Sequence, residues 1–229
     1  MEATPTFKLE TYRTLQALVY QTLREAILEG RLAPGQKLVA GTLAKELGVS
    51  RMPVREALSR LQQDGLVTAV PHKEVVVADF SERDVGEIYN IRSVLEAYAA
   101  RLFALGATPE QLTALKALLA DQEAAVAQGD RDRFRVKDNE FHHLLFATCD
   151  NRQLAQLLTT LWDQCLYYRS LAATLCRDLH RSLEHHRQIV AALERQDPEA
   201  AEQWVHTHTQ VARDTLLDHL RARTKNKEA

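Results

Sequence analysis

The histidines of this 229-residue chain gather in its second half, at spacings that can bring imidazole rings together. Eight of the nine lie between residues 142 and 219. Asp138 and His142 are four residues apart, so on a helix they project from one face. Three apolar residues of the same stretch turn that face inward: Phe134, Phe141 and Leu145. A carboxylate and an imidazole are therefore expected side by side in a protein interior.

Two further histidines are expected at the same depth. His186 and His208 each fall on an apolar stripe of a predicted helix. The turn at Asp197-Pro198 predicts an antiparallel helical hairpin, with His186 about 11 residues before it and His208 about 11 after it. At a rise of about 1.5 Å per residue, both side chains reach the same level.

One carboxylate and three imidazoles form a ligand set that suits Zn²⁺, Ni²⁺ or another borderline divalent ion. The predicted metal ligands are Asp138, His142, His186 and His208. Histidines that only hydrogen-bond to one another in a core would show the same spacing. The spacing alone leaves both interpretations open.

Arg92 is a charged residue inside the apolar stripe of a helix expected at 82–105. A buried cation is costly unless it has a partner. That partner is either an internal carboxylate such as a glutamate, or an anionic ligand held by the planar guanidinium fork.

A short arginine-bearing helix is expected at 51–64. Val54, Leu58 and Leu61 fall on one stripe, whereas Arg51, Arg55, Ser59 and Gln62 fall on another. Ser50 suits the N-cap, and Pro53 is tolerated in the first turn. The outward stripe suits the major groove of DNA, where arginine donates to guanine or phosphate. An ordinary solvated helix face is the alternative.

The elements around this helix favour DNA. A helix at 42–48 and a tight connection precede it, and β-rich runs at 66–70 and 75–78, joined at 71–74, follow it as a hairpin. A helix at 11–30 and a turn, "RLAPGQKL", come first. This order is that of a winged helix-turn-helix.

The composition indicates a water-soluble, mainly helical protein. Apolar residues make up 45% and charged residues 26%, with a net charge of −2, eight glycines and six prolines. We find no apolar run of membrane-spanning length and no signal peptide. The three cysteines are expected to be reduced thiols in a cytoplasmic protein.

The fold class is therefore expected to be mainly α, with a winged helix-turn-helix followed by an all-α antiparallel helical bundle. We assign residues 1–10 to a flexible leader, 11–79 to the DNA-binding domain, 80–222 to the helical domain and 223–229 to a frayed tail. The helices expected in the second domain are 82–105, 109–127, 130–148, 151–170, 173–195 and 198–221.

The segment "LAKELGVSRMPVREALSRLQQDGLV" resembles the helix-turn-helix signature of the GntR family of bacterial transcription regulators. The resemblance implies that the recognition helix and the hairpin tip contact DNA, the tip in the minor groove. On this basis Arg51 and Arg55 would contact DNA from the recognition helix, and His72 and Lys73 from the hairpin tip. Ser50, Met52 and Ser59, which lie at or on the same helix, are assigned to the DNA-binding surface with them. Three features depart from the usual pattern: Met52 replaces a common threonine, Glu74 replaces a glycine, and "VAGT" lacks a basic residue.

The second half resembles the all-helical FCD effector domain of the FadR subfamily of GntR regulators. The resemblance rests on "IYNIRSVLEAYAA", "DNEFHHLLFATCDNRQL", "EHHRQIVAAL" and "DPEAAEQWVHTH". It implies that Asp138, His142, His186 and His208 bind a metal that helps to hold a small carboxylate, whose acid group meets Arg92. The remaining histidines of this half match no ligand position: His143, His180, His185, His206 and His219.

Together these features predict a ligand-responsive transcription regulator, not an enzyme. We expect a repressor that binds a pseudo-palindromic double-stranded operator as a homodimer, with an organic acid as effector and no membrane partner. Two alternatives are a metal-dependent hydrolase fused to a DNA-binding module and a metal sensor without an organic effector.

Overall fold

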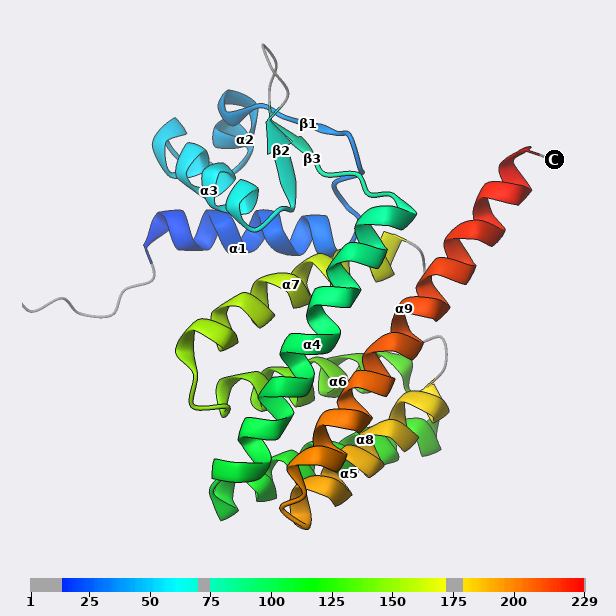
Figure 1. Cartoon of the computed structure of the whole chain (residues 1–229). Coiled ribbons are helices and arrows are strands. Elements are labelled where there is room, and N and C mark those ends of the chain that lie inside the picture. The colour runs from blue at the N-terminus through cyan, green and yellow to red at the C-terminus, as the bar shows by residue number, and fades with distance from the viewer. Residues whose placement is uncertain (1–13, 70–74, 172–178, 229) are drawn as a thin grey trace, which may run out of the picture. The chain divides into compact units, whose positions relative to one another are not determined.

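The computed structural model describes residues 14–69, 75–171 and 179–228. The chain divides into two compact units, Met1–Ala78 and Asp79–Ala229. They are called here the N-terminal unit and the helical unit, and each is described by itself (Figure 1).

The N-terminal unit combines three helices with a small antiparallel sheet. Its elements, in chain order, are α1 (Leu15–Leu28), β1 (Lys37–Leu38), α2 (Ala40–Glu46), α3 (Arg51–Gln63), β2 (Val67–Ala69) and β3 (Val75–Val77). The strand order is β1-β3-β2, and Val67 pairs with Val77. This is the predicted winged helix-turn-helix, and the fold class is confirmed.

The core of the N-terminal unit forms where α3 packs on α1. Val54 and Leu61 of α3 are fully buried, as is Ile27 of α1. Tyr20, a buried residue of the same core, donates a hydrogen bond of 2.6 Å to Asp64, and the Arg60 guanidinium lies over its ring at 4.1 Å. These contacts join α1 to the end of α3, so α1 supports α3 on the side opposite its exposed face.

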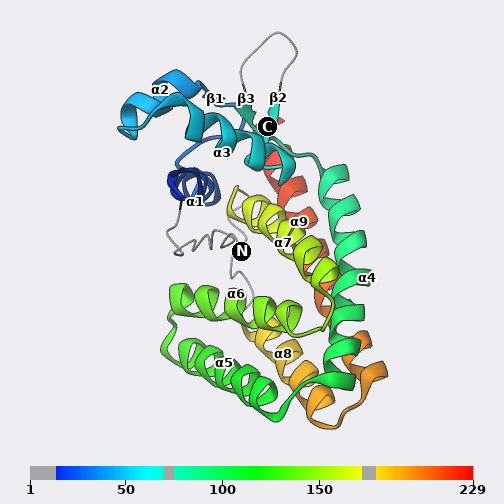
Figure 2. The same ribbon diagram turned by 90° about the vertical axis from the view of Figure 1, so that its left-hand side faces the viewer.

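The helical unit is a bundle of six helices within the described residues. They are α4 (Glu82–Gly106), α5 (Pro109–Gln128), α6 (Arg131–Ala147), α7 (Arg152–Leu171), α8 (Leu179–Glu194) and α9 (Pro198–Glu228). The long helices α4 and α9 run side by side, and α5 lies beside α6 and α8 (Figures 1 and 2). Polar side chains that point inward from α4, α6, α8 and α9 therefore share one interior.

Local signals in the sequence set the helix ends. Ser81 and Asp84 form a capping box at the start of α4, and Thr108 and Gln111 form another at the start of α5. Gly129 ends α5 with φ of +68°, a conformation that glycine adopts without strain.

Two elements differ from the sequence expectation. Residues 37–38, expected within a turn, form β1 and pair with β3. The last helix continues to Glu228, beyond the frayed tail expected from 223, because residues 222–228 contain neither proline nor glycine to break it. Within the described ranges, no helix is both long and apolar enough to cross a bilayer.

We expect Leu61→Ala to lower the free energy of unfolding of the N-terminal unit by about 2–5 kcal/mol, because it opens a cavity at a fully buried position. Leu18→Ala is the matched control, since Leu18 of α1 is 46% exposed, and its change should stay within about 0.5 kcal/mol. Guanidinium titrations followed by circular dichroism measure both. Equal losses would contradict the packing described for α3.

Candidate DNA-binding surface and buried histidine cluster

The outer face of α3 carries the predicted recognition residues. Ser50, Arg51, Met52, Arg55 and Ser59 are all exposed, and Met52 is 65% exposed. Ser50 occupies the N-cap, but its side chain makes no capping hydrogen bond. The N-terminal end of α3 therefore presents its backbone N–H groups and two guanidinium groups to solvent, as an anion-binding helix end would.

Arg51 lies against the preceding helix. A β-carbon placed on Gly41 of α2 would sit 3.5 Å from Nε of Arg51. The side chain thus has support from α2, although "VAGT" carries no basic residue of its own. His72 and Lys73, predicted to reach the minor groove, lie outside the described residues.

The histidine cluster, defined as Asp138, His142, His186 and His208, lies inside the helical unit. One nitrogen from each of its histidines falls within 4.8 Å of the others. Oδ1 of Asp138 lies 3.9 Å from Nε2 of His142 and 3.8 Å from Nε2 of His186. Helices α6, α8 and α9 each contribute, and the structure brings all four residues together as the sequence analysis expected.

A glutamine fixes the orientation of His186. Nδ1 of His186 lies 2.6 Å from Oε1 of Gln122 on α5, and Nε2 of Gln122 donates to the carbonyl of Lys137. The hydrogen bond to the Lys137 carbonyl fixes the orientation of the Gln122 amide, so Oε1 faces His186. An amide oxygen can only accept, and Nδ1 of His186 therefore carries the proton. The unprotonated Nε2 then faces Asp138.

Burial keeps the three imidazoles neutral. It lowers the pKa of His186 to about 3 and lowers the pKa values of His142 and His208 well below the usual range. Burial also raises the pKa of Asp138 to about 6, against the opposing effect of Arg169 and Arg92. At neutral pH the cluster therefore holds neutral imidazoles and a carboxylate, which are the protonation states that bind a cation.

Several nitrogens of the cluster are buried without a hydrogen-bond partner. They are both ring nitrogens of His142, Nε2 of His186 and Nδ1 of His208. Such orphaned polar atoms cost about 1–3 kcal/mol each unless another group satisfies them. A cation between the rings would do so. The ligand atoms around tetrahedral Zn²⁺ are about 3.4 Å apart. The histidine nitrogens here lie within 4.8 Å of one another, and Oδ1 of Asp138 lies 3.8 Å from Nε2 of His186.

Arg92 is buried and paired with Glu96, one turn further along α4. Nε of Arg92 donates to Oε1 of Glu96 at 2.7 Å, and the two side chains are 3% and 0% exposed. The guanidinium also lies over the rings of Tyr89 and Trp162, at 4.8 Å from each. In this structure the partner is thus the internal glutamate, one of the two alternatives that the sequence left open.

Glu96, Gln122, Trp162 and Arg169 are site residues that sequence reasoning missed. Nη1 of Arg169, on α7, lies 3.9 Å from Oδ2 of Asp138, and the ring of Trp162 lies 4.2 Å from that of His142. Only Glu96 had a readable signal, because it stands four residues after Arg92. The others come from helices whose packing no local spacing reveals.

The histidines without an assigned ligand role are not uniform. His180 is exposed, whereas His143, His185, His206 and His219 are half-buried. The ring of His185 lies 5.7 Å from that of His208, so His185 borders the cluster.

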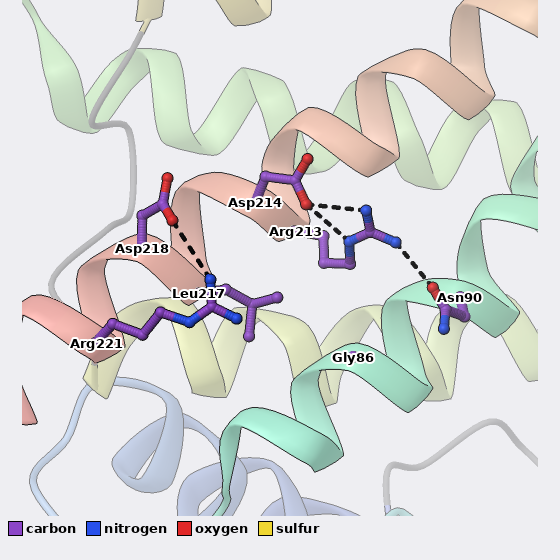
Figure 3. Close-up of a pocket in the computed structure, with 7 residues that line it drawn as sticks. All are labelled: Gly86, Asn90, Arg213, Asp214, Leu217, Asp218 and Arg221. Carbon is purple, nitrogen blue, oxygen red and sulfur yellow. Dashed lines mark hydrogen bonds and ion pairs between the residues drawn. The ribbon is translucent and has the colours of Figure 1, made fainter.

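A separate pocket of about 470 Å³ lies between α4 and α9 (Figure 3). It shares no residue with the cluster. Arg213 bonds to Asn90 and Asp214, and Arg221 pairs with Glu82 and Asp218. Each charged side chain in its lining is therefore already paired. The contacts of Arg213 with Asn90 and of Arg221 with Glu82 join α9 to α4.

Comparison with known proteins agrees with this two-part architecture. Residues 15–77 match the family model "Bacterial regulatory proteins, gntR family", and residues 87–211 match the FCD domain. The transcriptional regulator YdhC of Bacillus subtilis is 34% identical over 88% of this chain and 91% of its own. The transcriptional repressor RspR of Escherichia coli is 31% identical over 86% and 87%.

A solved structure shows the same fold. Escherichia coli McbR/YncC superposes with a TM-score of 0.74 at 28% identity, covering 89% of this chain and 97% of that one. The chain belongs to the GntR family of bacterial transcription regulators and carries an FCD effector domain. It is thus a helix-turn-helix regulator.

We expect Glu96→Gln to lower the stability of the helical unit by about 3–5 kcal/mol, because it leaves the Arg92 cation buried without its counter-charge. Glu87→Gln is the matched control. Glu87 pairs with Arg83 on the same helix, but both side chains are exposed, so no measurable change should follow. Thermal unfolding of the two variants compares them, and a stable Glu96→Gln protein would contradict the importance given to this pair.

Proposed function

We propose that this protein is a metal-containing, acid-responsive repressor that binds its operator as a homodimer. The observation that carries the proposal is the histidine cluster, with orphaned imidazole nitrogens in the effector domain of a GntR regulator. The repressor role is supported by RspR, a relative whose name states that role.

The outer face of α3 suits contact with the major groove. Arg51 and Arg55 are one turn apart at the N-terminal end of the helix, where the helix dipole favours phosphate. GntR-family regulators bind operator DNA and typically act as dimers. Two copies would then read two half-sites, which gives a pseudo-palindromic operator.

Asp138, His142, His186 and His208 are the residues that would hold a divalent ion, with Zn²⁺ or Ni²⁺ the best fit to three imidazoles and a carboxylate. Gln122 orients His186 for this task, as outer-shell partners do in metal sites. A bound ion supplies a Lewis-acidic point that attracts a carboxylate oxygen.

Arg92 and Arg169 are the groups that would meet the acid's negative charge. The positive charges of both guanidinium groups lower the pKa of Asp138 and so oppose the effect of burial. Because Glu96 already neutralises Arg92, an incoming carboxylate must share or displace that partner. An acid that favours one of these arrangements can shift α4, and β3 leads into α4 through residues 78–81 alone.

An apolar stripe on α4 supports the dimer. Ile91, Val94, Tyr98 and Leu105 are 52%, 63%, 46% and 65% exposed, at helical spacing on a face other than that of Arg92. A second copy of the chain would cover them across a twofold axis, since the same stripe can pack on itself.

We expect Arg51→Ala and Arg55→Ala each to weaken binding to a duplex that the wild-type protein selects from a random pool. If the arginine contacts a base, its loss should cost about 1–3 kcal/mol of binding free energy. If it contacts a phosphate, its loss should reduce the slope of log affinity against log salt concentration by about 1. Fluorescence anisotropy at several salt concentrations distinguishes the two. Arg83→Ala, an exposed arginine of the helical unit, is the control. Unchanged DNA binding by both α3 variants would exclude this face as the DNA-contacting surface.

We expect native mass spectrometry of the purified protein to show two chains and one divalent ion per chain. His186→Ala should lose the ion because it removes one of four ligands. His180→Ala replaces an exposed histidine of the same helix and should retain it. A wild-type protein that stays metal-free after incubation with Zn²⁺ or Ni²⁺ would refute the metal part of the proposal.

A further inference from the structure

Glu96 is a buried carboxylate that lies among three functional groups. It has no exposed surface. Oε1 accepts from Arg92, whereas Oε2 lies 3.2 Å from the hydroxyl of Thr209 and 4.0 Å from Nδ1 of His142. Thr209 directly follows His208 on α9. One side chain of α4 thus reaches the arginine and two of the helices that carry the histidine cluster.

His142 needs an acceptor that it does not have in this structure. Its Nε2 faces Asp138 and the interior of the cluster. When Nε2 serves as the ligand, the proton is on Nδ1, which is buried and has no hydrogen-bond partner. His186 has the same need, and Gln122 meets it at 2.6 Å. A carboxylate oxygen, Oε2 of Glu96, lies 4.0 Å from Nδ1 of His142.

We propose that Glu96 is the positioning residue of the metal site: it accepts a hydrogen bond from the Nδ1–H of His142 when metal binds, and through Arg92 it links that site to the acid ligand. The inference rests on the proposed function and adds to it the route between its two ligands. Ligating histidines almost always donate their second N–H to a carboxylate, carbonyl or water.

The link has a definite sign. Arg92 and His142 face different oxygens of the same carboxylate. Arg92 holds Oε1 at 2.7 Å, whereas Oε2 lies 4.0 Å from Nδ1 of His142, too far for a hydrogen bond. An acid that neutralises Arg92 weakens that hold and leaves Glu96 free to move toward His142. Acid binding should therefore tighten metal binding, and by linkage metal should tighten acid binding by the same factor.

The test measures affinity for Zn²⁺ alone, by competition with a chromophoric chelator. We expect Glu96→Gln to bind Zn²⁺ about 10- to 100-fold more weakly, the range found when an outer-shell partner of a ligand is lost. Glu199→Gln is the matched control, because Glu199 also pairs with an arginine, Arg101, but does so at the surface of the same unit. It should bind Zn²⁺ as the wild-type protein does.

A double variant avoids the loss of stability that Glu96→Gln alone is expected to cause. Glu96→Gln leaves Arg92 without its counter-charge, whereas Arg92→Gln combined with Glu96→Gln removes one charge of each sign. The net charge near the metal site is then unchanged, so weaker Zn²⁺ binding by the double variant reports the lost contact with His142 and not a change in the field. Circular dichroism without metal establishes that the variant is folded.

A His142→Ala background separates positioning from general support. If Glu96 acts through His142, adding the double substitution to His142→Ala should cause no further loss of Zn²⁺ affinity. Wild-type affinity in the folded double variant, or a loss that persists without His142, overturns the inference and leaves the proposed metal site intact. A wild-type protein that binds no Zn²⁺ overturns both.

Discussion

The high cost of removing ionisable groups from water governs the interior of the helical unit. Asp138, Arg92, Glu96 and three imidazoles lie almost fully buried, although charged groups usually lie at the surface. Each must be neutral or paired to be tolerated there. The histidines are neutral, Arg92 and Glu96 neutralise each other, and Asp138 is left among nitrogens without partners. The bundle therefore holds a region of unsatisfied polarity at its centre, which the cation proposed above would relieve.

The same constraint suits the bundle to the ligand response proposed above. A core of leucines and phenylalanines packs in one way, whereas a small set of buried charges has alternative pairings of similar energy. Glu96 illustrates this, because one carboxylate lies within reach of Arg92, Thr209 and His142. Which pairing is best depends on what occupies the cluster. Under the proposed function, a change at the centre of the helical unit would act on α4, the helix that follows the last strand of the N-terminal unit.

Much of this arrangement could be predicted from the sequence because helical periodicity encodes which face is buried. The inward positions of His142, His186 and His208, and the outward position of Arg51 and Arg55, follow from stripes read at 3.6 residues per turn. The shared level of His186 and His208 follows from their equal distance to the α8–α9 turn. Contacts between helices were not predictable: Gln122 meets His186, and the Trp162 ring lies 4.2 Å from the His142 ring, only because of how α5 and α7 pack. The strand β1 was missed because two residues are too short for an alternation to show.

Helix α4 presents opposite chemistry on two faces. One face holds Arg92 and Glu96 in the interior, and the other leaves Ile91, Val94, Tyr98 and Leu105 in solvent. Neighbouring residues such as Ile91 and Arg92 therefore serve different purposes while sharing one backbone. A substitution that alters the pitch or bend of this helix to suit a new small molecule also changes the angle at which the outer face meets whatever covers it. Under the proposed function, descendants of this gene can change their ligand preference only in ways that keep both geometries compatible, so the evolution of ligand binding is tied to that of dimer formation.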